Sequence, residues 1–552
     1  MLSKPRMLPL VLAVAIGCGA PGPDAGAVPA EERAPLYDDL GSHSHAISTA
    51  VPAAQRYFDQ GLRLTYAFNH AEAIRSFTEA TRLDPDCAMC FWGIALAWGP
   101  NINAPMDSAG GAAAWAAVRE AVRLAPGASP EERALIGALA TRYAESPPPE
   151  RAALDSAWAR AMAEVAAQHA DDDDALALYA DALMNLSPWD YWQADGQPKP
   201  ATIPMLASLE TVIARNENHA GACHLYIHAV EKVQPERGVG CAERLPSLMP
   251  GAGHIVHMPA HIFVRVGRYA DAITANEHAT HADESRLDEY APEGLYRLAY
   301  YPHNYHFMWF AASMAGNVEI AMSAARQTAA KVNPALMREP DYAALQHYLV
   351  TPLFTMVRFG RWDEILAEPA PPADVPYAVG IQRYARALAH IGGGRLAEAE
   401  AELAALDSIR AATPELADLL IWAINPAAAN LDIAAAVVAG ELAAARGRFD
   451  AAVASLRRGV AIEDAMLYDE PPTWHLPVRQ NLGAVLLAAG RAVEAESVYR
   501  ADLERFPENG WSLHGLATSL DAQGKRAEAN AARARFSAAW SRADVQPAGS
   551  RF

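Results

Sequence analysis

Six glycines recur in a common context along this chain, and their spacing limits the possible fold more than any other feature. Each is followed five residues later by a small or apolar residue: Gly267/Ala272, Gly316/Ala321, Gly360/Ile365, Gly394/Ala399, Gly447/Ala452 and Gly490/Ala495. A glycine at a helix end, followed by a small residue inside the next helix, is typical of repeated helical hairpins. No alternating pattern of strands accompanies these positions, so we expect an all-α chain.

The segment that follows residue 54 contains one such unit in full. Gly61 is followed by Ala73, Phe77, Ala80 and Pro85. Small residues allow two antiparallel helices to approach, the aromatic residue fills the seam, and the proline ends the second helix. This spacing resembles the tetratricopeptide repeat (TPR), and the resemblance extends over residues 50–540. It implies a TPR-like α-solenoid, a right-handed superhelix of helix–turn–helix repeats with inserted loops.

Composition excludes some functions. The chain has 552 residues, 52% of them apolar, and a formal net charge of −20. Its length suits a repeat array or several domains, and its apolar content does not suit disorder. Binding to nucleic acid is not expected, because no basic patch is present to neutralise phosphates.

Histidine is concentrated in residues 219–306, which hold 10 of the chain's 18 histidines. The pairs 224/228 and 257/261 are four residues apart, and the pairs 254/257 and 303/306 are three apart. Side chains at these spacings lie on one face of a helix. Counted back from the following turn glycine, His254, His303 and His347 share an offset of 13, His257 and His306 share an offset of 10, and His261 has an offset of 6.

These offsets form a single stripe, which the TPR resemblance places on the concave face. We therefore predict a polyhistidine metal site there, with ligands drawn from His224, His228, His254, His257, His261, His303, His306 and His347. Imidazole suits copper, zinc and iron. Copper is the expected ion, with zinc or iron as alternatives. Pro259 is expected to kink the helix between His257 and His261.

The alternative is a metal-free groove that holds a peptide or another envelope protein, with histidine acting as a neutral hydrogen-bonding ring. No Ser-His-Asp order, H-E-x-x-H motif or phosphate-binding loop is present. Catalytic residues therefore remain unassigned, although an open metal position would allow a metalloenzyme.

Four cysteines besides Cys18 suggest two disulfides, Cys87–Cys90 and Cys223–Cys241. For Cys87 and Cys90, which lie three residues apart, a second metal site is the alternative.

The first residues are typical of an export signal. Lys4 and Arg6 precede the apolar run Leu8–Ile16. The sequence Ala15-Ile16-Gly17-Cys18 resembles a bacterial lipobox, which implies lipidation of Cys18 and a periplasmic or cell-surface protein that touches the membrane only through this anchor. The chain as a whole thus resembles histidine-rich bacterial TPR lipoproteins.

The predicted organisation has five parts: a signal peptide at 1–18, a flexible tether at 19–49, N-terminal repeats at 50–218, histidine-rich repeats at 219–366 and C-terminal repeats at 367–552.

Overall fold

A computed structural model describes residues 33–106, 108–148, 150–287, 294–339 and 342–552. Its described residues are mostly helical, and the only strands among them are β1 (Leu420–Ile421) and β2 (Asn425–Pro426), which pair as a short antiparallel hairpin. The predicted all-α class is therefore confirmed. The predicted signal peptide and Cys18 lie outside the described residues.

The chain divides into two compact units. The first comprises residues 1–262 and 278–301, and the second comprises residues 263–277 and 302–552. The division falls inside the predicted histidine-rich segment 219–366. Each unit is a series of helices in which most neighbours in sequence pack against each other.

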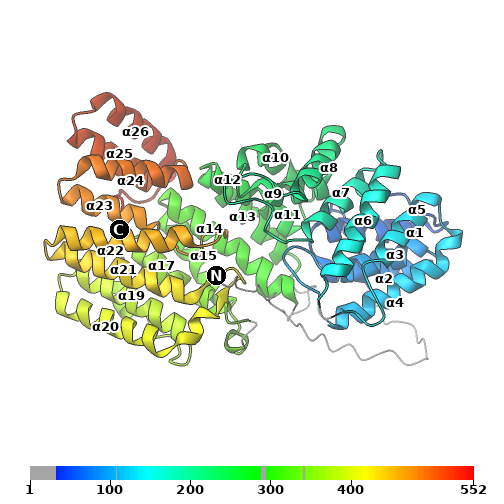
Figure 1. Cartoon of the computed structure of the whole chain (residues 1–552), viewed down its shortest axis with the longest axis horizontal. Helices are drawn as coiled ribbons and strands as arrows, with labels where there is room; N and C mark the ends of the chain where they lie inside the picture. Colours follow the sequence, from blue (N-terminus) through cyan, green and yellow to red (C-terminus); the bar gives the residue numbers. More distant parts are fainter. Residues whose placement is uncertain (1–32, 107, 149, 288–293, 340–341) are drawn as a thin grey trace, which may run out of the picture. The chain divides into compact units, whose positions relative to one another are not determined.

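The first unit begins with the helical hairpin α1/α2, which is followed by α3/α4 (Figure 1). Its helices are α1 (Pro52–Tyr66), α2 (His70–Leu83), α3 (Ala88–Trp98), α4 (Ser108–Leu124), α5 (Pro130–Ala140), α6 (Ala152–Gln168), α7 (Asp173–Met184), α8 (Thr202–Arg215), α9 (Ala220–Val230), α10 (Val239–Leu248) and α11 (Gly253–His257). The division between the units runs through α12 (Pro259–Arg265) and α13 (Tyr269–Glu284), and a π-helical turn at Tyr296–Tyr300 belongs to the first unit.

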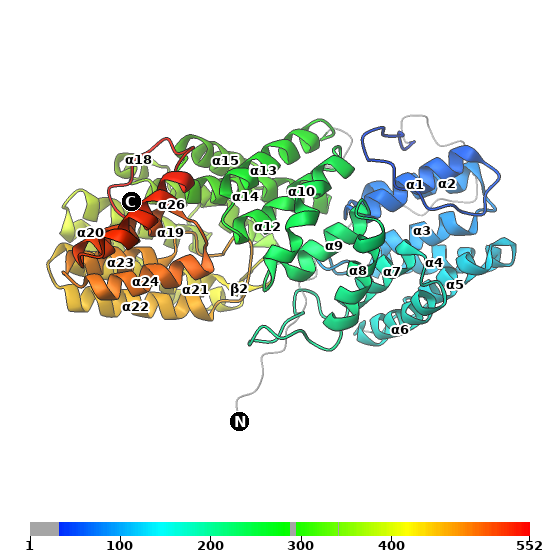
Figure 2. The same ribbon diagram turned by 90° about the horizontal axis from the view of Figure 1, so that it is seen from above.

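The second unit contains a longer run of hairpins, in which α21 to α24 lie side by side (Figure 2). Its helices are α14 (Tyr301–Ala315), α15 (Val318–Ala330), α16 (Leu345–Leu349), α17 (Thr351–Arg358), α18 (Trp362–Ala367), α19 (Pro376–Gly392), α20 (Leu396–Ala412), α21 (Ala427–Ala445), α22 (Phe449–Ala465), α23 (Val478–Ala488), α24 (Ala492–Arg505), α25 (Gly510–Ala522) and α26 (Arg526–Ala539).

The six turn glycines of the sequence pattern all have positive φ, between 62° at Gly360 and 78° at Gly267. This left-handed conformation ends a helix and is open to glycine at little cost. The predicted turn positions are therefore confirmed.

The first hairpin shows why the repeat needs small residues. Phe77 on α2 is fully buried between Gly61 on α1 and Gly93 on α3. A Cβ atom at Gly61 would lie 2.6 Å from the Phe77 ring, and one at Gly93 would lie 2.4 Å from it. The three helices pack at this distance because both positions lack a side chain.

The described part of the predicted tether, residues 33–49, packs against the first unit. The Tyr37 backbone N–H donates to Gln60 Oε1 at 2.8 Å, and the Gly251 N–H donates to the Asp39 carbonyl at 2.9 Å. Leu40 is 1% exposed. Hydrophobic burial and these hydrogen bonds hold the segment, although its sequence has no helical pattern.

Two disulfides are present. Cys87 joins Cys90 at the start of α3, and Cys223 on α9 joins Cys241 on α10. In this structure Cys87 and Cys90 are bonded to each other, not held as a pair of metal-ligating thiolates.

Among the described residues, α21 alone has the length and apolar composition that a membrane-spanning helix needs, and 72% of its apolar window is buried inside the protein. Its packing against α19, α20 and α22 accounts for this composition.

The seam around Phe77 generates a stability prediction. We expect Gly93→Ala to lower the free energy of unfolding by about 1–3 kcal/mol, because the new methyl group overlaps the ring. Gly137→Ala is the matched control. Gly137 lies on α5 with no neighbouring atom within 4 Å of its added Cβ, so this change should stabilise the helix by about 0.5–1 kcal/mol. Urea unfolding measures both, and equal effects would contradict the packing argument.

Candidate metal centre

Two helices of the first unit bring three histidines together. His224 and His228 lie one turn apart on α9, with ring centroids 4.9 Å apart. His254, at the start of α11, lies with its ring 4.9 Å from His224 and 6.3 Å from His228. One ligand atom from each ring lies within 4.8 Å of the other two. All three side chains are at most 2% exposed.

Hydrogen bonds fix which nitrogen carries the proton in two of these rings. His224 Nδ1 lies 2.6 Å from the Tyr66 carbonyl oxygen, which can only accept. His228 Nδ1 lies 3.3 Å from Glu231 Oε1. Both Nδ1 atoms therefore donate, and each Nε2 atom keeps its lone pair. These Nε2 atoms and both ring nitrogens of His254 have no hydrogen-bond partner among the described residues.

The carboxylate of Glu231 holds two imidazoles. It accepts from His228 through Oε1, and its Oε2 lies 2.7 Å from His261 Nδ1. Burial alone would raise the pKa of Glu231, but the imidazoles of His261 and His228 lower it. Glu231 therefore stays ionised although it is buried.

His257 completes a five-histidine group in the first unit. Its ring lies 4.9 Å from His261 and 6.0 Å from His254. The expected kink is present, because the helix breaks after His257 and Pro259 begins α12.

Burial keeps the three central rings neutral. It lowers the pKa of His224 and His254 well below the usual 6.5, and repulsion from neighbouring imidazoles lowers both further. Burial also lowers the pKa of His228, against the opposing effect of Glu231. The site is thus a buried cluster of neutral rings with one nitrogen from each within 4.8 Å of the other two, and three imidazole nitrogens are a donor set that a transition metal accepts.

The other predicted ligands lie in the second unit. His306 on α14 and His347 on α16 have ring centroids 5.6 Å apart, and His347 Nδ1 bonds to the Tyr377 hydroxyl at 2.8 Å. The His303 ring lies 5.0 Å from Phe307. The eight predicted ligands are therefore divided between the units, five in the first and three in the second.

Sequence reasoning did not identify a second cluster, centred on Asp174. Its carboxylate accepts from four groups: His43 Nε2 at 3.0 Å, His45 Nδ1 at 2.9 Å, His219 Nε2 at 3.2 Å and the Tyr66 hydroxyl at 2.6 Å. Burial alone would raise the pKa of Asp174, but the hydrogen bonds from the histidines hold it well below its usual range.

This cluster is better explained by hydrogen bonding than by a metal. His219 Nδ1 accepts from the Ala222 N–H at 3.0 Å, so its proton lies on Nε2 and points at Asp174. A metal at Nε2 would need the lone pair that this proton occupies. The one sequence signal was the acidic run Asp171–Asp174, which is typical of the start of a helix and contains the N-cap Asp172 of α7.

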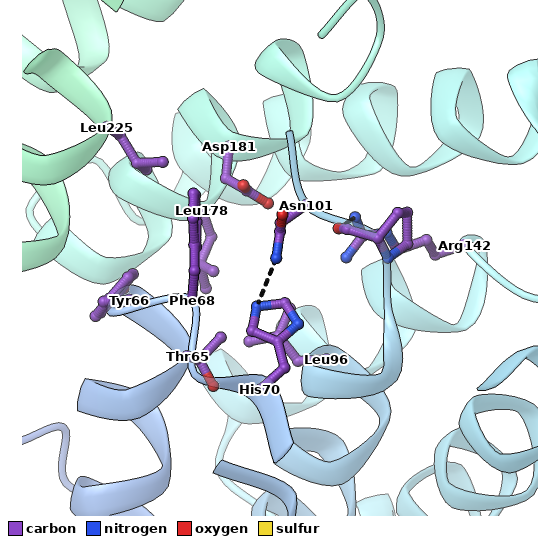
Figure 3. Close-up of a pocket in the computed structure, with 11 residues that line it drawn as sticks. Thr65, Tyr66, Phe68, His70, Leu96, Asn101, Arg142, Leu178, Asp181 and Leu225 are labelled. Atoms are coloured by element: carbon purple, nitrogen blue, oxygen red, sulfur yellow. Dashed lines mark hydrogen bonds between the residues drawn. The ribbon is translucent and has the colours of Figure 1, made fainter. Parts of the chain in front are cut away.

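A small pocket lies beside the histidine cluster, and Figure 3 shows the residues that line it. Phe68 separates the two, with its ring 4.4 Å from His224 and 6.2 Å from His70. Across the pocket His70 bonds to Asn101 at 3.4 Å, and burial raises the pKa of Asp181 to about 6. The full lining is Thr65, Tyr66, Phe68, His70, Leu96, Pro100, Asn101, Arg142, Leu178, Asp181 and Leu225.

Two aromatic residues that contact the cluster have left-handed backbones. Phe68 has φ 55°, and Trp189, with its ring 5.0 Å from His228, has φ 64°. This conformation is unfavourable for large side chains, and such strain is common at functional sites. The Trp189 Nε1–H donates to the Ile102 carbonyl at 2.9 Å, which joins two inserted loops beside the histidines.

The lowered histidine pKa values generate a prediction for the metal-free protein. Below pH 6.5 the histidines of the unfolded chain become protonated, whereas the buried rings of His224 and His254 in the folded protein stay neutral. The free energy of unfolding therefore has its full value above pH 6.5. Below pH 6.5 it falls by about 1.4 kcal/mol per pH unit for each histidine that stays neutral in the folded protein. We expect the urea midpoint of chelator-treated protein to fall between pH 7 and 5.5, and a flat profile would contradict it.

Replacing His254 distinguishes a histidine that serves the candidate metal site from one that stabilises the fold. Neither of its ring nitrogens has a partner among the described residues, so His254→Leu should stabilise the metal-free protein by about 1–2 kcal/mol and reduce its pH dependence. His224→Leu is the matched control. It leaves the Tyr66 carbonyl without its donor and should destabilise the protein. Urea unfolding at pH 7 tests the pair, and equal signs would argue against the assigned hydrogen bonds.

No model of a known protein family matches this chain, and no curated protein matches it. Among solved structures, a human IFIT1 dimer with m7Gppp-AAAA is 12% identical and covers 89% of this chain and 90% of its own, with a TM-score of 0.31. The Cut9–Hcn1 hetero-tetramer of the APC/C is 12% identical over 89% and 74%, with a TM-score of 0.29. The P58(IPK) TPR domain is 10% identical over 86% and 98%, with a TM-score of 0.22. These similarities are too distant to indicate a function.

Proposed function

We propose that this protein is an exported helical-repeat protein that binds one transition-metal ion through His224, His228 and His254. One observation carries the proposal: three buried, neutral imidazoles bring one ring nitrogen each to within 4.8 Å of the other two. Each neutral imidazole has one nitrogen lone pair, and a cation bound among the three rings would accept all three. A metal ion is the occupant that fits.

The surrounding residues support this role. Metal-binding histidines commonly donate their second N–H to a carbonyl or carboxylate, which fixes the ring and raises its basicity. Tyr66 does this for His224, and Glu231 does it for His228. Phe68 and Trp189 cover the rings and keep water from them.

Copper is the proposed ion, because its divalent form has the highest affinity for nitrogen sites among first-row metals. Zinc and iron are the alternatives. Three protein ligands leave a position for water or substrate, so the ion would supply Lewis-acid or redox chemistry.

Export and a lipid anchor at Cys18 are part of the proposal. The disulfides Cys87–Cys90 and Cys223–Cys241 support an oxidising compartment, since such bonds seldom persist in the cytosol.

Metal loading tests the function. We expect chelated and reloaded protein to bind about one copper ion per chain tightly, as measured by elemental analysis and titration. His224→Ala should abolish this binding, because two ligands remain. Glu231→Gln should weaken it by about 10–100-fold, because His228 and His261 lose their anionic partner.

His278→Ala is the control, because that histidine is exposed and outside the cluster. It should bind metal as the wild type does. Equal binding by wild type and His224→Ala would overturn the proposal. Binding of an envelope protein that survives chelation would then favour the metal-free scaffold.

A further inference from the structure

The residues after α26 turn back over the second unit. This C-terminal segment, residues 541–552, contains no helix or strand. At its start, the Asp544 carboxylate accepts from the Val318 and Glu319 backbone N–H groups at 2.7 and 2.9 Å, at the first turn of α15. The start of the segment is therefore held by α15, which is far in sequence from α26, the helix that the segment follows.

Its last residues lie on helices of three different hairpins. The Ser550 hydroxyl donates to the Gln480 carbonyl on α23 at 2.8 Å and lies 2.7 Å from the Tyr499 hydroxyl on α24. Ser550 is 2% exposed. The Phe552 ring packs edge-on against Trp362 on α18 at 5.2 Å. Each side chain thus occupies its own contact, as in a bound extended peptide.

The contact between Ser550 and Phe552 in sequence is an ion pair, and it limits the possible ligands of this site more than the other contacts do. Arg551 pairs with Glu441 on α21, a carboxylate that is 3% exposed. The second oxygen of Glu441 accepts from Asn481 Nδ2 at 2.8 Å. A buried carboxylate that loses its cation is strongly destabilised. Whatever occupies this position must therefore bring a positive charge.

We infer that this face of the second unit is a binding site for an extended peptide with a hydroxyl, a basic and an aromatic residue in succession, and that Ser550–Phe552 fill it in cis. The site uses no histidine of the metal centre. It therefore stands or falls independently of the proposed function.

The attached segment competes with any such partner. A covalently linked ligand has an effective concentration of about 1 mM when its linker spans the site. A free peptide at micromolar concentration therefore binds the intact protein poorly. Weakening the segment's own contacts opens the site, and the ion pair is the place to do so.

The test uses the full-length chain and a fluorescein-labelled peptide with the sequence of residues 546–552. Fluorescence anisotropy should show saturable binding to Arg551→Glu protein at least about tenfold tighter than to wild type, because the altered segment repels Glu441. A peptide with glutamate in place of its arginine should lose at least about tenfold in affinity for the same variant. Adding Glu441→Gln to the variant should weaken binding of the unaltered peptide.

Arg542→Glu is the matched control. It makes the same charge change in the same segment, but its side chain is exposed. This variant should bind the peptide as wild type does. Phe552→Ala opens the site without a change of charge and should also raise peptide affinity.

Equal peptide affinity for wild type, Arg551→Glu and Phe552→Ala would overturn the inference, as would binding that ignores the peptide's arginine. A wild-type mass in solution that is doubled and falls to monomer in Arg551→Glu would place the segment on a second copy, and would overturn its assignment in cis.

Discussion

The hydrogen bond between His224 Nδ1 and the Tyr66 carbonyl is the contact on which the histidine cluster depends. It joins α9 to the end of α1 and leaves the lone pair of His224 on Nε2, in a ring whose centroid lies 4.9 Å from those of His228 and His254. Tyr66 is itself held by its hydroxyl, which donates to Asp174, and by Gly221, where a Cβ would come 2.4 Å from the ring. The orientation of one imidazole is thus set by a carbonyl, a carboxylate and a missing side chain.

The cluster destabilises the fold that carries it. A buried polar group without a partner costs about 1–3 kcal/mol, and the cluster contains several such nitrogens. The disulfide from Cys223, the residue before His224, ties α9 to α10 at this place. A disulfide of this kind contributes about 2–4 kcal/mol. The disulfide therefore offsets, at the same place in the fold, the instability that the buried histidine cluster introduces.

Local spacing predicted much of this architecture. The turn glycines, the small residues around Phe77 and the pairs 224/228 and 254/257 all act within one or two helical turns, where sequence separation determines which side chains are neighbours. The two disulfides were also predicted from the sequence, because four cysteines allow only a few pairings.

The remainder depends on contacts that sequence separation does not constrain. His43 and His45 reach Asp174 across more than a hundred residues, and the segment that carries them has no periodic pattern. Offsets from the turn glycines placed six histidines on one stripe, but they carried no information on where one compact unit ends and the next begins. The tautomers and the left-handed backbone of Phe68 likewise follow from tertiary contacts alone.

Each unit contains a buried carboxylate, and the difference between their partners explains the difference in their proposed roles. Glu231 is paired with imidazoles from α9 and α12, which cannot leave without unfolding the helices, so its charge is permanently used to orient ligands. Glu441 is paired with an arginine on a segment that has no helix or strand, and we infer that another peptide can take its place. A carboxylate with a fixed partner is part of a rigid site. A carboxylate with an exchangeable partner instead favours the binding of a ligand that carries a positive charge.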